Sequence, residues 1–221
     1  MRILIVAATQ PEVDPLMQTL GMQKSDEEEN LFVTRHPSVA NCSVLVTGAG
    51  MVPTAFALGR HLPHNVYNLV VNLGVAGSFD RNIKLGEVLE ITKDTFAELG
   101  AEDDTRFINI EQLGLGASIF NPTSSLGHFT GKINLPKATA ITVNTVHGND
   151  NTIAGVVSRV NPQLESMEGA AFFFACRQLK VPCVQIRAVS NYVEKRNRDN
   201  WQIGLAVKNL NTFALDLIRE L

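Results

Sequence analysis

Residues 165–175, ESMEGAAFFFA, place two glutamates directly before an uncharged and mostly apolar run. Residues 184–191, VQIRAVSN, follow as a second apolar segment that ends in a polar pair. The first segment predicts a helix over 168–179, and the second predicts a buried strand over 184–189. A carboxylate at such a helix start, beside a strand that leads into Ser190 and Asn191, suits a pocket for a sugar and its attached ring.

The rest of the chain alternates between predicted strands and helices. Strands are expected at 2–8, 31–35, 43–47, 69–73, 87–92 and 138–146, and helices at 12–20, 51–62 and 201–218. Residues 96–137 show little periodicity and predict long loops, with a part that is mobile or contacts a partner. Because strands that alternate with helices form mainly parallel, covered sheets, the pattern predicts one α/β domain over residues 1–221.

The composition is typical of a globular domain. The chain has 221 residues, of which 45% are hydrophobic and 19% charged, and its net charge is −3. This charge gives no general attraction to nucleic acid or to a membrane, and no apolar run is long enough to span a bilayer. Cys42, Cys176 and Cys183 lie in apolar contexts without metal-ligand spacing. They predict reduced core thiols in a cytoplasmic protein with no metal site.

Ligands of such sheets bind at the carboxyl ends of the strands. That rule groups four segments into one predicted pocket, namely residues 9–12, 72–78, 143–148 and 190–191. The helix start at Met167 and Glu168 would close this pocket, and glycines within 72–78 would let backbone amides approach a ligand. For Glu12 and Glu168 the alternative is an ordinary acidic residue in the first turn of a helix, which is what Glu165 is expected to be.

Three further side chains belong to the same prediction. The amide of Asn191 offers donors and an acceptor, so it can donate to a purine carbonyl and accept from a protonated ring nitrogen. The alternative for Asn191 is a turn residue at a strand end. Arg187 lies within an apolar strand and therefore needs a partner, so we expect it to orient a pocket glutamate. His147 follows a predicted strand and is expected to line the pocket.

Several segments together resemble the nucleoside phosphorylase and nucleosidase superfamily, and within it the futalosine hydrolases. The segments are residues 71–79 (VNLGVAGSF), 94–103, 143–146, 165–171 and 187–201. The resemblance implies a three-layer α/β/α fold with a central mixed, partly barrel-like sheet, and a homo-oligomer that is a dimer or larger. It implies hydrolysis of the N-glycosidic bond of futalosine to hypoxanthine and dehypoxanthinylfutalosine, a step in bacterial menaquinone biosynthesis, without a metal or organic cofactor.

The resemblance also implies roles for single residues. Glu12 matches the glutamate that activates the attacking water, and Met167 with Glu168 matches the pair that holds the ribose. Substrate contacts are expected from Val75, Ala76, Gly77, Val146, Ser166, Met167, Arg196 and Arg198. Asn191 stands where methylthioadenosine/S-adenosylhomocysteine nucleosidases have an aspartate that can donate a proton. An amide cannot donate one, but it suits a 6-oxopurine, whose carbonyl needs a donor.

Two questions stay open from the sequence. The benzoate of futalosine needs a cation, for which Arg196 and Arg198 are the candidates, with Trp201 as an apolar wall; a solvated basic loop is the alternative. The alternative functions are a methylthioadenosine/S-adenosylhomocysteine-type nucleosidase, a purine nucleoside phosphorylase, and a purine nucleoside sensor without turnover. A phosphorylase needs arginines near its glycine segments, and residues 72–78 contain none. A sensor has no need of a water-activating Glu12.

Overall fold

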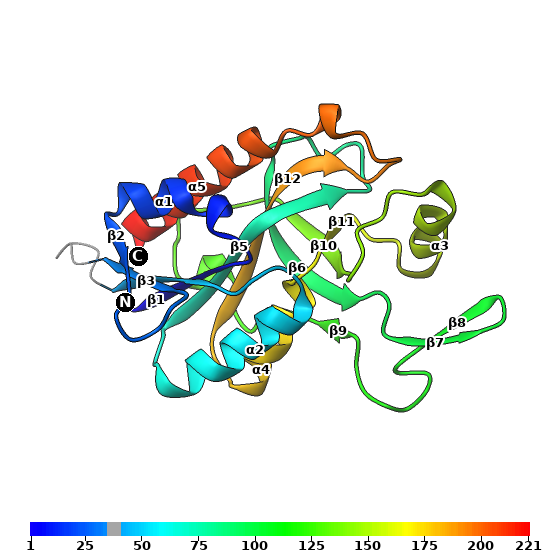
Figure 1. Ribbon diagram of the computed structural model, residues 1–221, viewed down its shortest axis with the longest axis horizontal. Helices are drawn as coiled ribbons and strands as arrows, with labels where there is room; N and C mark the ends of the chain where they lie inside the picture. The colour runs from blue at the N-terminus through cyan, green and yellow to red at the C-terminus, as the bar shows by residue number, and fades with distance from the viewer. Residues whose placement is uncertain (35–40) are drawn as a thin grey trace.

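A computed structural model describes residues 1–34 and 41–221, so the last position of the strand predicted at 31–35 lies outside the described residues. The main sheet consists of β1 (Ile3–Ala7), β2 (Met22–Lys24), β3 (Leu31–Thr34), β4 (Cys42–Val46), β5 (Leu69–Ser78), β6 (Val88–Phe96), β9 (Ile119–Phe120), β10 (Lys137–Thr142), β11 (Leu164–Ser166) and β12 (Cys183–Tyr192) (Figure 1). Its strand order is β11-β10-β6-β12-β5-β1-β4-β3-β2, and β9 pairs with β6.

Part of this sheet closes on itself. Strand β11 pairs parallel with β10 and antiparallel with β5, so β11, β10, β6, β12 and β5 form a closed ring of five strands. Strands β5 and β12 have ten residues each and pair in parallel along nearly their whole length. Because long strands twist, they carry the sheet round until β11 can bridge its two ends. The predicted mixed, partly barrel-like sheet is confirmed.

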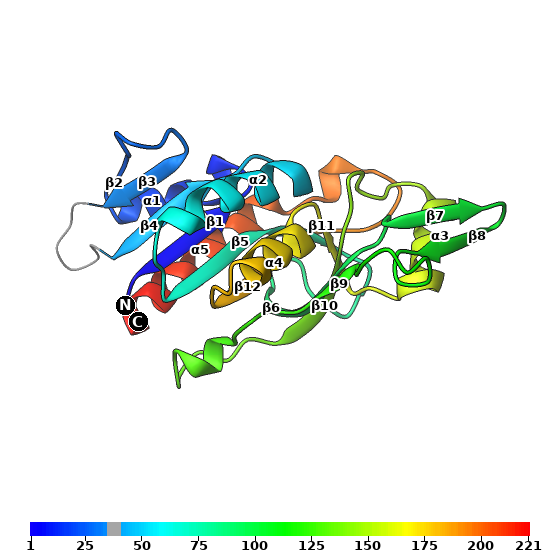
Figure 2. The same ribbon diagram turned by 90° about the horizontal axis from the view of Figure 1, so that it is seen from below.

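Helices cover both faces of the sheet. They are α1 (Asp14–Thr19), α2 (Met51–His61), α3 (Asp150–Val160), α4 (Gly169–Gln178) and α5 (Ile203–Glu220). Helices α1 and α5 lie on one face and α2 and α4 on the other, which confirms the three layers, while α3 lies beyond the end of the sheet (Figures 1 and 2). In α5, Ala206, Leu210, Ala214 and Leu217 recur at helical spacing and are fully buried.

Several predicted element boundaries were wrong. Strand β5 continues past Leu73 to Ser78, and β12 continues past Val189 to Tyr192, whereas β10 already ends at Thr142. The glycines and polar residues that were predicted to follow these strands are therefore paired residues within the strands. The closed ring supplies hydrogen-bonding neighbours on both sides of each strand. Strands β2 and β11 and helix α3 were not predicted, since the two strands are too short to show a period.

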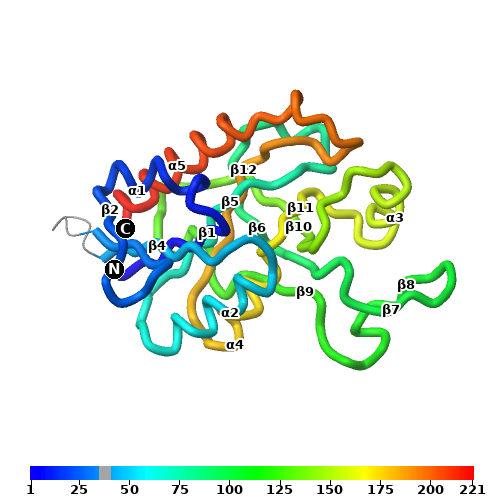
Figure 3. Tube along the Cα trace, in the orientation of Figure 1, coloured from blue at the N-terminus to red at the C-terminus, as the bar shows by residue number. Residues whose placement is uncertain are grey.

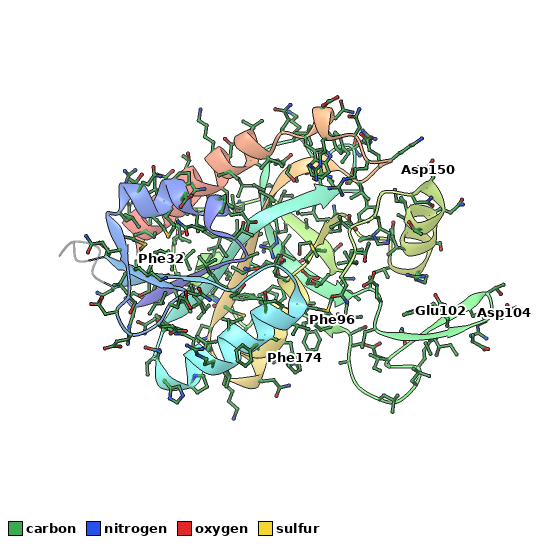
Figure 4. The ribbon with its side chains drawn as sticks, in the orientation of Figure 1. Phe32, Phe96, Glu102, Asp104, Asp150 and Phe174 are labelled. Carbon is green, nitrogen blue, oxygen red and sulfur yellow. The ribbon has the colours of Figure 1, made fainter. Side chains whose placement is uncertain are left out.

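The segment 96–137 is only partly the long loop that was predicted. It contains β9, a 3₁₀ turn and the separate two-stranded hairpin of β7 (Gly100–Asp103) and β8 (Arg106–Asn109). Asp104 adopts a left-handed conformation with φ 52° in the hairpin turn, which Asp tolerates better than most residues. The hairpin projects away from the sheet, with Glu102 and Asp104 toward its far end (Figure 4).

An aromatic cluster joins β6, β9 and α4 on the face that α2 and α4 cover. The ring of Phe120 contacts those of Phe96 and Phe174 at centroid distances of 5.7 and 5.6 Å, both edge-on. Figure 4 shows Phe96 and Phe174 near one another. At the opposite end of the molecule from the hairpin, the two termini lie side by side (Figures 2 and 3). Within the described ranges, none of the helices has the length and apolar character that crossing a membrane requires.

Candidate active site

A cavity of about 380 Å³ opens where β1, β5, β11 and β12 end. These ends come together toward the side of the molecule that carries α3 (Figure 3). The residues predicted from the sequence that line it are Glu12, Val75, Ala76, Gly77, Val146, Ser166, Met167, Glu168, Asn191 and Arg196. Arg198 is the one predicted site residue that is not part of this lining.

Glu12 is held at the cavity by backbone and side-chain donors. It ends a 3₁₀ turn, Gln10–Glu12, that directly follows β1, and Pro11 presets the backbone of that turn. The Oε2 atom accepts hydrogen bonds from the backbone nitrogen of Thr9 at 2.9 Å and from Oγ1 of Thr9 at 2.8 Å. The Oε1 atom accepts from the backbone nitrogen of Val75 at 3.1 Å. The carboxylate is therefore fixed in orientation while it lines the cavity.

Glu168 is the residue directly before helix α4, and it lines the cavity. Its side chain is buried, and Oε1 accepts a hydrogen bond from the backbone nitrogen of Gly50 at 2.8 Å. Burial raises the pKa of Glu168, and the nearby charge of Glu12 raises it further, whereas the guanidinium of Arg187 and the Gly50 amide lower it. The backbone amide of Met167 also lowers the pKa, and beyond these donors the carboxylate has acceptor capacity left for hydroxyl groups of a ligand.

Buried polar groups beneath α4 hold the start of this helix in place, and with it Glu168. The backbone nitrogen of Ala170 donates to Oγ1 of Thr142 at 2.7 Å, and that hydroxyl donates to Oδ1 of Asp94 at 2.8 Å. Asp94 is fully buried, and desolvation raises its pKa to about 6. A Cβ atom at Gly169 would collide with the Asp94 carboxylate, so only glycine lets α4 start this close to the sheet.

Arg187 lies behind the two glutamates. Its Nη2 donates to Oδ1 of Asn72 at 2.6 Å, and the side chain is buried. Arg187 is in register with Gly74 on β5, where a Cβ atom would lie 2.6 Å from Nη1 of Arg187 and 3.2 Å from Oε1 of Glu12. Gly74 thus makes room for protein side chains rather than for a ligand. The guanidinium supplies the positive charge that two neighbouring carboxylates need.

Asn191 is presented by an irregularity in β12. The register between β12 and β5 shifts between Val189 and Asn191, so Ser190 is the extra residue of a bulge. Oγ of Ser190 donates to Oδ1 of Asn191 at 2.8 Å, and Nδ2 of Asn191 donates to the carbonyl of Tyr192 at 3.0 Å. One amide hydrogen and one lone pair of Oδ1 remain for a ligand.

Glu165 and His147 form a pair that the sequence did not predict. Glu165 is not a helix-start acid, because it lies on β11 with an exposed fraction of 4%. Its Oε2 lies 2.6 Å from Nδ1 of His147, and its Oε1 accepts from the backbone nitrogen of His147 at 2.9 Å. Burial raises the pKa of Glu165, and the bonds from His147 oppose that shift. No signal in the sequence joins these residues, since the contact depends on how β11 closes the ring.

The rim of the cavity carries a cation stacked on an aromatic ring. The guanidinium carbon of Arg196 lies 5.0 Å from the ring centroid of Trp201, and both residues line the cavity. Arg198 lies farther from the same ring, at 5.9 Å, and outside the lining. In the described part of the chain, no cluster of three His, Cys, Asp or Glu side chains is suited to hold a metal ion.

This geometry can support cleavage of a glycoside. Two carboxylates lie on one side of the cavity, where Glu12 can take a proton from water and Glu168 can hold hydroxyl groups and stabilise developing positive charge. Met167 lines the same cavity and offers an apolar surface. Asn191 also lines the cavity and offers a donor and an acceptor, as a flat polar ring requires.

Comparisons with known proteins show the family and the fold of this chain. The family model of the phosphorylase superfamily matches residues 2–219. The futalosine hydrolase of Streptomyces coelicolor is 30% identical over 95% of this chain and 92% of its own, and that of Thermus thermophilus is 29% identical over 80% of each chain. A methylthioadenosine/S-adenosylhomocysteine nucleosidase of Colwellia psychrerythraea, solved with adenine, superposes with a TM-score of 0.83 at 23% identity, covering 100% of this chain and 96% of that one.

Proposed function

This chain belongs to the phosphorylase superfamily, and from that premise we propose that it hydrolyses futalosine to hypoxanthine and dehypoxanthinylfutalosine. The reaction breaks one C–N glycosidic bond and consumes one water, and it would place the protein in menaquinone biosynthesis. The observation that carries this proposal is the combination, in one cavity, of Glu12 and Glu168 with the amide of Asn191.

The two carboxylates have different roles at the sugar. As C1′ separates from the base it gains oxocarbenium character, so negative charge beside the ribose lowers the barrier. Glu168 supplies that charge and binds the ribose hydroxyls, while Met167 packs against the apolar face of the sugar. Glu12 removes a proton from the water that attacks C1′. The three donors that already hold the Glu12 carboxylate fix its direction before the substrate enters.

Hydrolysis is favoured over phosphorolysis by the charges at the cavity. A phosphate co-substrate needs several cationic donors beside the sugar. The one arginine in the lining is Arg196, which stacks on Trp201 at the rim, and Arg187 behind the glutamates donates to Asn72. The decisive assay incubates the purified protein with futalosine, aminofutalosine, methylthioadenosine and inosine, each with and without phosphate. We expect phosphate-independent release of hypoxanthine from futalosine as the fastest reaction, and faster release of adenine would contradict the proposal.

Asn191 is expected to select a 6-oxopurine over a 6-aminopurine. Its free amide hydrogen can meet the O6 carbonyl, whereas an adenine amino group would face that hydrogen and leave both donors unpaired. Such a mismatch costs about 1–3 kcal/mol, which predicts a roughly 5- to 150-fold preference for futalosine in kcat/KM. In the Asn191→Asp variant the preference should weaken. The ratio of kcat/KM for futalosine and aminofutalosine, measured in both forms, checks this, and a wild-type preference for the amino compound would refute it.

Arg196 is expected to bind the benzoate of futalosine. Its guanidinium is held over Trp201 at the rim, and a carboxylate and an aromatic ring on the substrate match that cation and that apolar wall. Arg196→Gln should raise KM for futalosine up to about 5-fold with little change in kcat, because an exposed ion pair contributes up to roughly 1 kcal/mol. Arg198→Gln is the matched comparison. If only the Arg198 variant raises KM, the benzoate is bound by that arginine instead.

A further inference from the structure

The pair of His147 and Glu165 has no part in the steps described so far, although both side chains line the cavity. Their side chains have exposed fractions of 10% and 4%. Both carboxylate oxygens of Glu165 accept from His147, one from its backbone nitrogen and one from Nδ1. Phe79 packs edge-on against the imidazole, with 6.2 Å between the ring centroids. The imidazole is therefore held in one orientation on the wall of the cavity.

The pair stands next to the amide that binds the base. Gly77 on β5 is in register with Asn191 on β12 and with Glu165 on β11. A Cβ atom at Gly77 would lie 3.3 Å from Nδ2 of Asn191 and 3.7 Å from Cγ of Glu165. One glycine therefore separates the two groups, and the His147–Glu165 pair borders the same end of the cavity as Asn191.

The departing purine needs a proton that Asn191 cannot give. When the C1′–N9 bond breaks, the electron pair goes to hypoxanthine, and protonation of the ring makes it a better leaving group. Glu12 and Glu168 act at the water and the sugar, and both oxygens of Glu165 are occupied by His147. Across the described residues, Nε2 of His147 makes no hydrogen bond to another protein group. A carboxylate behind Nδ1 stabilises the imidazolium and orients Nε2.

Given the futalosine hydrolysis proposed above, we infer that His147 is the general acid of the reaction and that Glu165 is its positioning residue. The proton on Nε2 moves to a ring nitrogen of hypoxanthine as the C1′–N9 bond breaks. The water oxygen bonds to C1′, and the proton that the water loses moves to Glu12. Proton exchange with solvent then restores both residues. Charge and atoms balance without a further reactant.

The test compares leaving groups that differ in their need for a proton. His147→Gln should lower kcat on futalosine by about 10²-fold or more, the usual contribution of a positioned acid. On p-nitrophenyl riboside, whose nitrophenolate leaves as an anion, the same variant should stay within about threefold of the wild type because no proton is required. Glu165→Gln should show the same pattern with a smaller loss. His64→Gln, the same substitution at an exposed histidine, is the control. Equal losses on both substrates, or a normal rate on futalosine, would overturn the inference.

Chemical rescue gives a second readout that does not depend on how well the small riboside is bound. In His147→Ala, added imidazole should restore futalosine cleavage, whereas pyrazole, which has the same shape but is a far weaker base, should not. Rescue by both compounds or by neither would reject His147 as the acid. Wild-type protein that releases no hypoxanthine from futalosine would instead reject the proposed substrate, so the two failures are distinguishable.

Discussion

The Glu12→Gln variant is expected to bind futalosine but to turn it over about 10²-fold or more slowly, because glutamine keeps the shape of the side chain and removes its basicity. The carboxylate is oriented by donors from Thr9 and from the backbone of Val75. Those contacts explain why the effect should fall on the chemical step. The substitution changes the group that takes the proton from water, while the ribose and the base keep their contacts with Glu168 and Asn191.

Single-turnover release of hypoxanthine measures that step, and isothermal titration of the slow variant with futalosine measures binding. Glu27→Gln, the same substitution at an exposed acid in the connection between β2 and β3, is the control and should leave both quantities unchanged. A Glu12→Gln variant with near-normal turnover would remove Glu12 from the role of base. A large loss of affinity with unchanged turnover would assign it to substrate binding instead.

The second large effect is expected when the substrate lacks its 2′-hydroxyl. Glu168 is buried and its Oε1 accepts from the amide of Gly50, so the ribose hydroxyls complete its hydrogen bonding. A buried carboxylate that loses a partner costs about 1–3 kcal/mol or more, which corresponds to a roughly 5- to 150-fold lower kcat/KM for 2′-deoxyfutalosine. The loss should exceed what the missing contact area alone would cause.

A double comparison separates Glu168 from other ribose contacts. In Glu168→Gln, futalosine cleavage should fall strongly. The ratio of kcat/KM between the ribo- and deoxyribo-substrates should shrink toward one, because the group that binds the 2′-hydroxyl has lost its charge. Both substrates are assayed with both forms under the same conditions. Equal rates of the wild type on the two substrates would show that Glu168 does not bind the 2′-hydroxyl.

Much of the fold and of the candidate site could be predicted from local sequence patterns. The alternation of apolar strands and helices led to one α/β domain with a covered sheet, the family resemblance implied its three layers, and the apolar run after Glu168 led to α4. Strand ends in a covered sheet meet at one edge, and that rule placed Glu12, Glu168 and Asn191 together before any contact was known. These conclusions could be drawn from the sequence because hydrophobic period and chain order are both local properties.

The tertiary structure alone decided the features that depend on contacts across the chain. Strand β11 has three residues and no period, yet it closes the ring and brings Glu165 to Gly77. Glu165, predicted to be an acidic residue at a helix start, is therefore the buried partner of His147. Gly74, expected to approach a ligand, instead admits the Arg187 guanidinium. The sequence by itself determined which residues could carry the chemistry. Their pairing was decided by strand register and ring closure, because each pair forms only when distant segments are packed at van der Waals distance.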